Sequence, residues 1–307
     1  MRIVFMGTPD FAVNALDALV SAGHEIVGVF TQPDKPQGRK MVLTAPPVKV
    51  FAESKGLTVY QPNSVKTDEA YELLKSLNPD LIAVVAYGKI LPKNILDLPK
   101  FGCVNAHASL LPKYRGASPI QCSIYYGDKK TGVTTMLMDE GMDTGDMLLT
   151  AETDILPTDN FETLHDRLAE MGAKLLSQTV TALQNGTVTP VKQPDEDVSY
   201  APIITKEMGK IDFNSNSNEI DCKIRAFTPW PSAYFYHGEK NVKVISAVIG
   251  DKTNEAAGTV IENKTCLTVA CGGGTSIKFV KVQPQGKGVM TAKDFINGHH
   301  IALGTKL

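Results

Sequence analysis

Along the first part of the chain, apolar runs typical of buried strands alternate with segments whose apolar residues recur at helical spacing. Apolar runs of strand length occupy 2–8, 24–31, 57–61, 80–87 and 102–109. Between them, apolar residues recur at helical spacing over 10–23, 46–56 and 67–77. Because strands that alternate with helices are typical of βαβ units, we predict an α/β fold with a mainly parallel sheet.

The same pattern predicts where the first domain ends. A helix is expected over 118–127, a hairpin over 131–139 and 146–155, and a long amphipathic helix over 160–186. Residues 189–206 then contain three prolines and an acidic cluster without a period, which is typical of a linker. We therefore predict a catalytic-type α/β domain at 1–188 and a linker at 189–206.

The remainder, 207–307, has a different character. After a predicted helix over 216–227 come five short β-like segments with turns every 8 to 12 residues, and then a helix over 291–298. Short strands at that spacing favour a small β-barrel. This region carries 12 Lys and Arg against 9 Asp and Glu, a weak indication of an anionic partner.

Composition narrows the class of protein. The 307 residues are 43% hydrophobic and 21% charged, as expected for a soluble globular chain. The first apolar run is broken at residues 7–10, too early for a signal peptide or a membrane span. We therefore expect no membrane association. Five cysteines show no zinc-site spacing, so we also expect no metal and a cytoplasmic location.

The stretch VNAHASLLPKYRGASPIQ, residues 104–121, carries the candidate chemistry. Asn105 and His107 end a predicted strand, at the edge where α/β sheets bind ligands, and their i, i+2 spacing puts both on one face. Alone, such a pair is more often a turn cap and a core histidine. Asp143, in a glycine-punctuated loop, adds a carboxylate, and the three groups together suit acyl-type transfer through oxyanion stabilisation and proton transfer.

These segments resemble the folate-dependent formyltransferases. The resemblance rests on residues 105–121, on Thr131-Gly132-Val133-Thr134 and on the D-T-G-D run from Asp143, and GTPDFAV, VVAYGKILP and RAFTPWPSAYF extend it over nearly the whole chain. It implies a Rossmann-like formyltransferase domain followed by an OB-like barrel at 207–307 that binds tRNA. It also implies that Asn105, His107 and Asp143 are catalytic and that 10-formyltetrahydrofolate is the formyl donor, without a metal.

The resemblance further implies a pocket for the tetrahydrofolate derivative, much of it made by backbone. Its expected residues follow three predicted strands: Tyr87, Gly88, Ile90, Leu91 and Pro92; Ser109, Leu110, Leu111 and Pro112; Leu137 and Asp139.

The acceptor is indicated by the stretch TQPDKPQGRKMVLTAPPVK, residues 31–49. It resembles the inserted loop of family members that formylate initiator methionyl-tRNA. A mobile loop with Lys35, Arg39, Lys40 and Lys49 suits contact with phosphates. The chain departs from the expected pattern at Lys40 and Met41, where Gly and Lys are expected.

Other functions stay open at this point. An amino-sugar formyltransferase shares the catalytic residues but is expected to lack the basic loop, and a glycinamide ribonucleotide formyltransferase is expected to end after one domain. A non-catalytic RNA-binding protein would have no need of the three polar groups. Ser109 is a poor nucleophile candidate because it has no G-x-S-x-G turn, and Trp230 is expected in a core or domain interface.

Overall fold

The structure is a computed structural model that describes residues 1–38 and 40–307. The chain divides into two compact units. The first comprises Met1–Pro119, Lys130–Asp154 and His165–Ala201, and the second comprises Ile120–Lys129, Ile155–Leu164 and Pro202–Leu307. Residues 189–201 of the expected linker at 189–206 therefore belong to the first unit, and residues 202–206 belong to the second.

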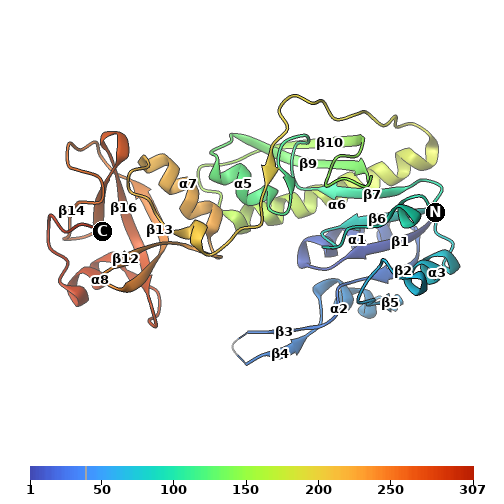
Figure 1. Cartoon of the computed structure of the whole chain (residues 1–307), viewed down its shortest axis with the longest axis horizontal. Helices are drawn as coiled ribbons and strands as arrows, with labels where there is room; N and C mark the ends of the chain where they lie inside the picture. The colour runs from blue at the N-terminus through green and yellow to red at the C-terminus, as the bar shows by residue number, and fades with distance from the viewer. Residues whose placement is uncertain (39) are drawn as a thin grey trace. The chain divides into compact units, whose positions relative to one another are not determined.

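The first unit is built on a seven-stranded sheet of order β10-β9-β7-β6-β1-β2-β5 (Figure 1). The strands are β1 (Arg2–Gly7), β2 (Glu25–Phe30), β5 (Val59–Tyr60), β6 (Leu81–Val85), β7 (Cys103–His107), β9 (Lys130–Leu137) and β10 (Met147–Asp154). Five strands pair in parallel, and β9 and β10 add two antiparallel pairings. The predicted mainly parallel sheet is thus confirmed. All five residues of β6 are buried, which explains its unbroken apolar sequence.

The helices follow the predicted pattern, except that α4 (Lys93–Leu96) was not predicted. They are η1 (Asp10–Ala12), α1 (Val13–Ser21), α2 (Pro47–Ser54), α3 (Asp68–Ser76), α4 (Lys93–Leu96), α5 (Pro119–Tyr125) and α6 (Phe161–Asn185). Thr67 starts α3 by accepting a hydrogen bond from the Ala70 amide. The long helix α6 packs on β9, where the hydroxyls of Thr135 and Thr179 are 2.8 Å apart.

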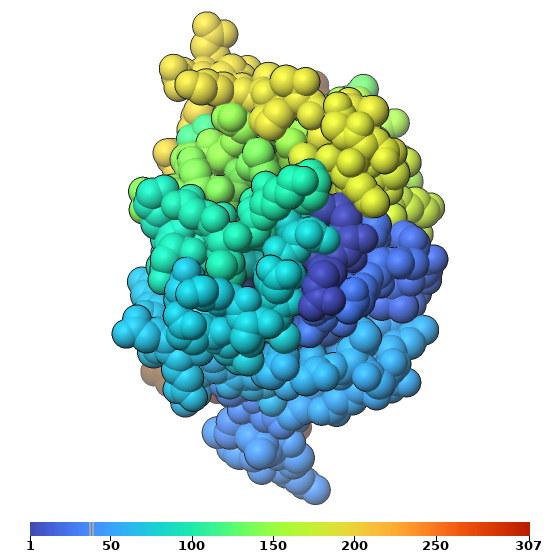
Figure 2. Space-filling model, turned by 90° about the vertical axis from the view of Figure 1, so that its right-hand side faces the viewer, coloured from blue at the N-terminus to red at the C-terminus, as the bar shows by residue number. Residues whose placement is uncertain are grey.

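Two short pairings have no counterpart in the predictions. Strands β3 (Lys35–Gln37) and β4 (Val42–Thr44) form a hairpin within the stretch expected to be an irregular loop, and this hairpin projects from the first unit (Figures 1 and 2). Strand β8 (Arg115–Gly116) pairs in parallel with β11 (Tyr200–Ala201). Segments of two or three residues are too short for any hydrophobic period, so the sequence pattern cannot reveal them.

The second unit contains an antiparallel sheet of order β12-β13-β16-β15-β14, with β17 also paired to β16. Its elements are η2 (Glu207–Gly209), α7 (Ser217–Phe227), β12 (Ala233–His237), β13 (Lys240–Ile249), β14 (Val260–Glu262), β15 (Leu267–Cys271), η3 (Gly272–Gly274), β16 (Thr275–Pro284), β17 (Met290–Thr291) and α8 (Ala292–His299). A capping box of Asn216 and Glu219 begins α7. The stacked rings of Phe235 and Phe279, 5.4 Å apart, lie in the core. The predicted β-rich domain is confirmed, and closure of its sheet into a barrel stays a prediction.

Within the part of the chain that the structure describes, no helix combines the length and hydrophobicity needed to cross a membrane.

All five cysteines are free thiols, and three of them are buried. Burial raises the pKa of the Cys103 thiol to about 12 and the pKa values of Cys122 and Cys271 to about 11. Because the thiolate is the nucleophile, we expect these three to resist iodoacetamide at pH 8 in the native protein, whereas half-buried Cys266 reacts. Peptide mass spectrometry checks this, with labelling of all five in denaturant as the control. Native labelling of Cys103 as fast as Cys266 would contradict the packing described above.

Candidate active site

Strand β7 delivers two polar side chains to the middle of the sheet. Asn105 lies between Val84 of β6 and Met136 of β9, and His107 lies opposite Thr134 of β9. The two residues are two apart on an extended strand, so their side chains share a face. The His107 side chain is only 6% exposed.

The loop after β9 brings a carboxylate to this pair. Because β9 is antiparallel to β7, it ends beside the amino-terminal half of β7, and the loop folds back over the β7 side chains. Asp143 then lies with one carboxylate oxygen, Oδ1, 3.4 Å from Nδ2 of Asn105 and the other, Oδ2, 3.6 Å from Nδ1 of His107. The backbone N–H of Gly116 donates to Oδ2 at 2.8 Å. The three predicted residues are therefore brought together.

The His107 ring has one defined orientation. Its Nε2 is 2.9 Å from the backbone carbonyl oxygen of Tyr114. A carbonyl oxygen can only accept, so Nε2 carries the hydrogen, and Nδ1 is the nitrogen that faces Asp143. Proton exchange at this histidine is consequently directed to Nδ1, on the side of the carboxylate.

The turn that follows His107 is held by two hydroxyl groups. Ser109 donates from Oγ to the Lys113 carbonyl at 2.6 Å. Thr134 donates to the Ser109 carbonyl at 2.8 Å and accepts from the Leu111 amide at 3.1 Å. Ser109 is fully buried, and its hydroxyl is used inside the turn rather than presented to a substrate.

Two of the three segments expected to bind the folate pack together, those at 87–92 and 137–139. Tyr87 and Leu91 are buried in a core cluster against which Met138, between Leu137 and Asp139, also packs. Burial raises the pKa of Tyr87 to about 12. The backbone here is shaped by contacts: the Tyr87 carbonyl accepts from Thr8 and Gln32, and Gly88 has φ 78°.

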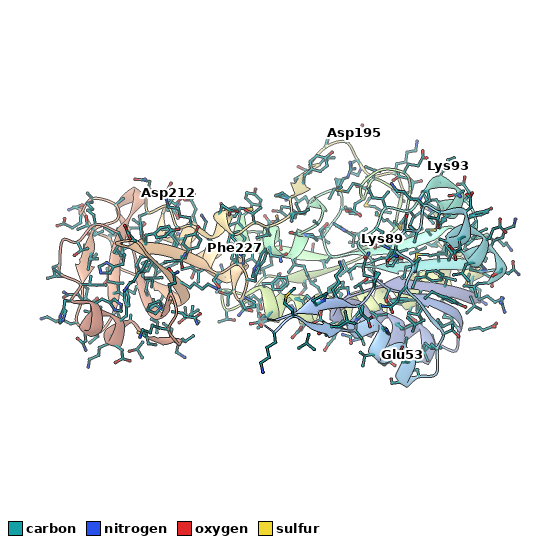
Figure 3. All side chains as sticks on the ribbon, turned by 60° about the horizontal axis from the view of Figure 1, so that its bottom comes forward. Glu53, Lys89, Lys93, Asp195, Asp212 and Phe227 are labelled. Carbon is teal, nitrogen blue, oxygen red and sulfur yellow. The ribbon has the colours of Figure 1, made fainter. Side chains whose placement is uncertain are left out.

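The side chains in and near the expected folate-binding segments have different environments. Ile90 is 64% exposed, whereas Leu111 is buried. Lys89, labelled in Figure 3, donates to the carbonyls of Pro62 and Asn63 at 2.6 and 2.8 Å. Asp139 is exposed, and its Oδ1 accepts from the Gly141 amide and the Thr144 hydroxyl.

The basic residues of the inserted stretch differ in environment. Lys49 donates to the Asp34 carboxylate at 3.0 Å and to Gln61 at 2.9 Å, so its ammonium is engaged inside the protein rather than held out for a phosphate. Hydrogen bonds from Gln61 and Lys49 lower the pKa of Asp34. Lys35 and Lys40 are exposed on the β3–β4 hairpin, and Arg39 lies outside the described residues.

One contact to the site was not predicted. Gln193, placed by the sequence pattern in a linker, donates from Nε2 to the backbone carbonyls of Asp143 and Gly145, both at 2.8 Å. Its Oε1 accepts from Nε of Arg115 at 3.0 Å. A glutamine among prolines and acids carries no periodic signal, so only the tertiary structure reveals it.

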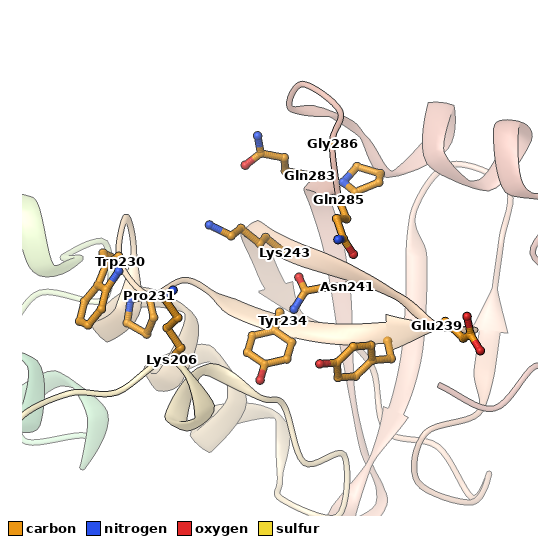
Figure 4. A pocket seen from close by; sticks show the side chains of 12 residues that line it. Lys206, Trp230, Pro231, Tyr234, Glu239, Asn241, Lys243, Gln283, Gln285 and Gly286 are labelled. Atoms are coloured by element: carbon orange, nitrogen blue, oxygen red, sulfur yellow. The ribbon is translucent and has the colours of Figure 1, made fainter. Parts of the chain in front are cut away.

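The second unit has a cavity of its own, of about 680 Å³, lined by aromatic, basic and amide side chains (Figure 4). Its walls include Trp230, Tyr234, Tyr236, Lys206 and Lys243. Trp230 is 52% exposed, so it does not lie in a core; the other expected place, a domain interface, stays a prediction. Among the described residues, no group of three His, Cys, Asp or Glu is placed to hold a metal.

Comparison with protein families gives two matches that together cover most of the chain. Residues 1–180 match the formyl transferase family, and residues 203–300 match the formyl transferase C-terminal domain. Among solved structures, the chain resembles an N-formyltransferase from Helicobacter canadensis in complex with folinic acid and dTDP-3-aminofucose, with a TM-score of 0.69 at 21% identity over 91% of this chain and 98% of that one. HypX from Aquifex aeolicus, in complex with tetrahydrofolic acid, has a TM-score of 0.62 at 14% identity over 96% and 47%. At these identities the likeness shows a shared fold.

Full-length relatives are much more similar. The methionyl-tRNA formyltransferase of Caldanaerobacter subterraneus is 49% identical over 309 residues, covering 100% of both chains. That of Bacillus subtilis is 47% identical over 308 residues, covering 100% of this chain and 97% of its own. This chain therefore belongs to the formyl transferase family and groups within it with the methionyl-tRNA formyltransferases.

Proposed function

We propose that this protein transfers a formyl group from 10-formyltetrahydrofolate to the α-amine of methionine esterified to initiator tRNA. The observation that carries the proposal is the convergence of Asn105, His107 and Asp143 in a chain whose relatives share its full length. Because the acceptor is a charged tRNA, the proposed place of action is the cytoplasm.

In the proposed reaction, the amine nitrogen attacks the formyl carbon and the carbonyl oxygen becomes an oxyanion. Nδ2 of Asn105 and a protonated Nδ1 of His107 stabilise that oxyanion. The carbon–N10 bond of the folate then breaks, and the proton lost from the amine reaches the leaving nitrogen. Asp143, 3.6 Å from Nδ1 of His107, orients the attacking amine and relays this proton.

The folate is proposed to lie along the segment Tyr87–Pro92, the turn 109–112 and the residues Leu137 and Asp139. The left-handed Gly88 and the exposed Ile90 support this placement, since they present backbone and apolar surface beside β6. Because Tyr87 and Leu91 are buried, backbone groups are the proposed contacts there.

For the tRNA, we propose contacts from the β3–β4 hairpin and from the second unit. Exposed Lys35 and Lys40 supply positive charge, and Arg39 belongs to the same stretch. We also propose that 207–307 is an OB-like tRNA-binding domain that follows the catalytic domain. The aromatic cavity of the second unit offers faces on which bases stack (Figure 4).

An amino-sugar acceptor is the alternative, because the similar Helicobacter canadensis structure contains dTDP-3-aminofucose. We expect labelled formyl from 10-formyltetrahydrofolate to appear on methionyl-tRNA when methionyl-tRNA, a nucleotide-linked amino sugar and glycinamide ribonucleotide are offered in parallel. Label on the sugar would retain the three catalytic residues and overturn the proposed acceptor. Binding of RNA without any transfer would favour a non-catalytic protein.

The catalytic residues can be tested by substitution. We expect His107→Ala and Asp143→Asn each to lower turnover at least about a hundredfold, because one oxyanion or proton-transfer group is lost. Asp143→Asn keeps an oxygen that can accept from Gly116 but cannot take up a proton. Asp68→Asn, the same change at an exposed aspartate in the first turn of α3, is the control. Near-native turnover would remove the substituted residue from the catalytic set.

The hairpin lysines can be tested through salt dependence. Each Lys contact to a phosphate releases counterions, so replacing Lys35 and Lys40 by Gln should weaken tRNA binding and lower the slope of log K against log salt by about two. Filter binding at several salt concentrations measures this. Lys174→Gln on the exposed face of α6 is the matched control. An unchanged slope would show that the hairpin does not contact phosphates.

A further inference from the structure

The segment 191–201 runs along the active site and is attached at both of its ends. At one end Val191 and Met147 exchange backbone hydrogen bonds of 2.8 and 2.9 Å. At the other, β11 pairs with β8, and the Ala117 amide donates to the Ala201 carbonyl at 2.9 Å. Between these attachments the chain passes the loop that carries Asp143 and the segment that carries Arg115 and Gly116.

Gln193 is the residue of this segment that turns inward. Residues 191–197 are all exposed except Gln193, which is partly buried, whereas Asp195 lies on the outer stretch (Figure 3). The Gln193 amide uses both of its functions. Nε2 donates to the carbonyls of Asp143 and Gly145, and Oε1 accepts from Arg115.

The backbone that Gln193 holds is an unusual one. Asp143 has φ 54°, in the left-handed region that few residues other than glycine adopt. At Gly145 a Cβ atom would lie 1.7 Å from the Leu137 carbonyl oxygen, so the loop also turns too tightly for a side chain there. Such a conformation persists only where surrounding contacts fix it. The two hydrogen bonds from one amide span the turn and supply such a contact.

The contacts close into a ring around the carboxylate. Gly116 donates to Oδ2 of Asp143, Gln193 binds the backbone carbonyl of Asp143, and Arg115, the neighbour of Gly116, binds Gln193. The side chain of Asp143 is thus held by the Gly116 amide, and its backbone is held by Gln193 of the segment 191–201. The positive charge of Arg115 polarises the amide and strengthens the hydrogen bonds that it donates.

We propose that Gln193 is a positioning residue for Asp143. It holds the loop 138–146 so that the carboxylate stays within reach of Asn105 and His107, and Arg115 orients the Gln193 amide. This inference rests on the proposed function, because it assigns Gln193 a role through a catalytic carboxylate. Residues 191–201 then form part of the active site rather than a passive connection.

Substitution of Gln193 by Met tests the proposal in the full-length protein. Methionine keeps the length of the side chain and removes all three hydrogen bonds. We expect kcat for formyl transfer to methionyl-tRNA to fall about tenfold to a hundredfold, the range that small displacements of a catalytic group produce. KM for both substrates should stay within about twofold, since Gln193 is not proposed to touch either. The control is Gln184→Met at an exposed position of α6, expected to match the unsubstituted protein.

A second variant, Gln193→Glu, separates the two halves of the amide. Its carboxylate keeps an acceptor for Arg115 but, when ionised, has no N–H for the carbonyls of Asp143 and Gly145. We expect this variant to lose at least as much kcat as Gln193→Met. Near-native kcat in Gln193→Glu would overturn the assignment of the two donated hydrogen bonds as the positioning contacts.

A double-mutant cycle distinguishes positioning from general stability. If Gln193 acts through Asp143, adding Gln193→Met to Asp143→Asn should lower kcat less than about twofold further. A full tenfold additional loss, or a loss in Gln193→Met that follows only the fraction of unfolded protein measured by circular dichroism, would overturn the proposal.

Failure of this inference and failure of the proposed function give different results. If the unsubstituted protein transfers no formyl group to methionyl-tRNA, or if Asp143→Asn keeps near-native turnover, the proposed function or its catalytic set is wrong. If Asp143→Asn is inactive while Gln193→Met has native kcat, the proposed function stands and the positioning role of Gln193 is wrong.

Discussion

The Asp143 carboxylate has to stay beside two side chains of β7, although it belongs to a loop 38 residues beyond Asn105. No strand pairing holds that loop, because β9 ends at Leu137 and β10 begins only at Met147. The site therefore depends on a few hydrogen bonds to the loop from elsewhere in the first unit. Asp143 itself accepts hydrogen bonds from the Gly116 amide and the Gln193 side chain, at 2.8 Å each.

The sheet supplies the rigid half of this arrangement. β6 and β7 lie in the interior of the seven-stranded sheet, and the buried residues of β6 pack on both faces. Asn105 and His107 consequently have little freedom of backbone movement. The Tyr114 carbonyl then fixes the His107 ring, so one half of the candidate site is preorganised by the core and the other half by loop contacts.

This division explains what could be predicted from the sequence. The apolar runs locate β1, β2, β6 and β7, and the two-residue spacing of Asn105 and His107 puts them on one face, because both signals depend on local periodicity. The meeting with Asp143 is implied by the resemblance to a family and agrees with the geometry. Other features have no local period in the sequence that could reveal them: the β3–β4 hairpin, the ion pair of Lys49 with Asp34 and the exposure of Trp230.

The side chain at position 193 shows why such a contact is specific in its chemistry. Two carbonyl oxygens and one guanidinium N–H surround it, so the residue has to donate twice and accept once. A lysine would satisfy the carbonyls but would face the positive charge of Arg115, and an ionised glutamate would satisfy Arg115 but would repel the carbonyls. Either would also place a full charge beside the Asp143 loop and alter the electrostatics of the carboxylate. A neutral amide of this length can make all three hydrogen bonds. A solvent-exposed linker would not require such a specific side chain at this position.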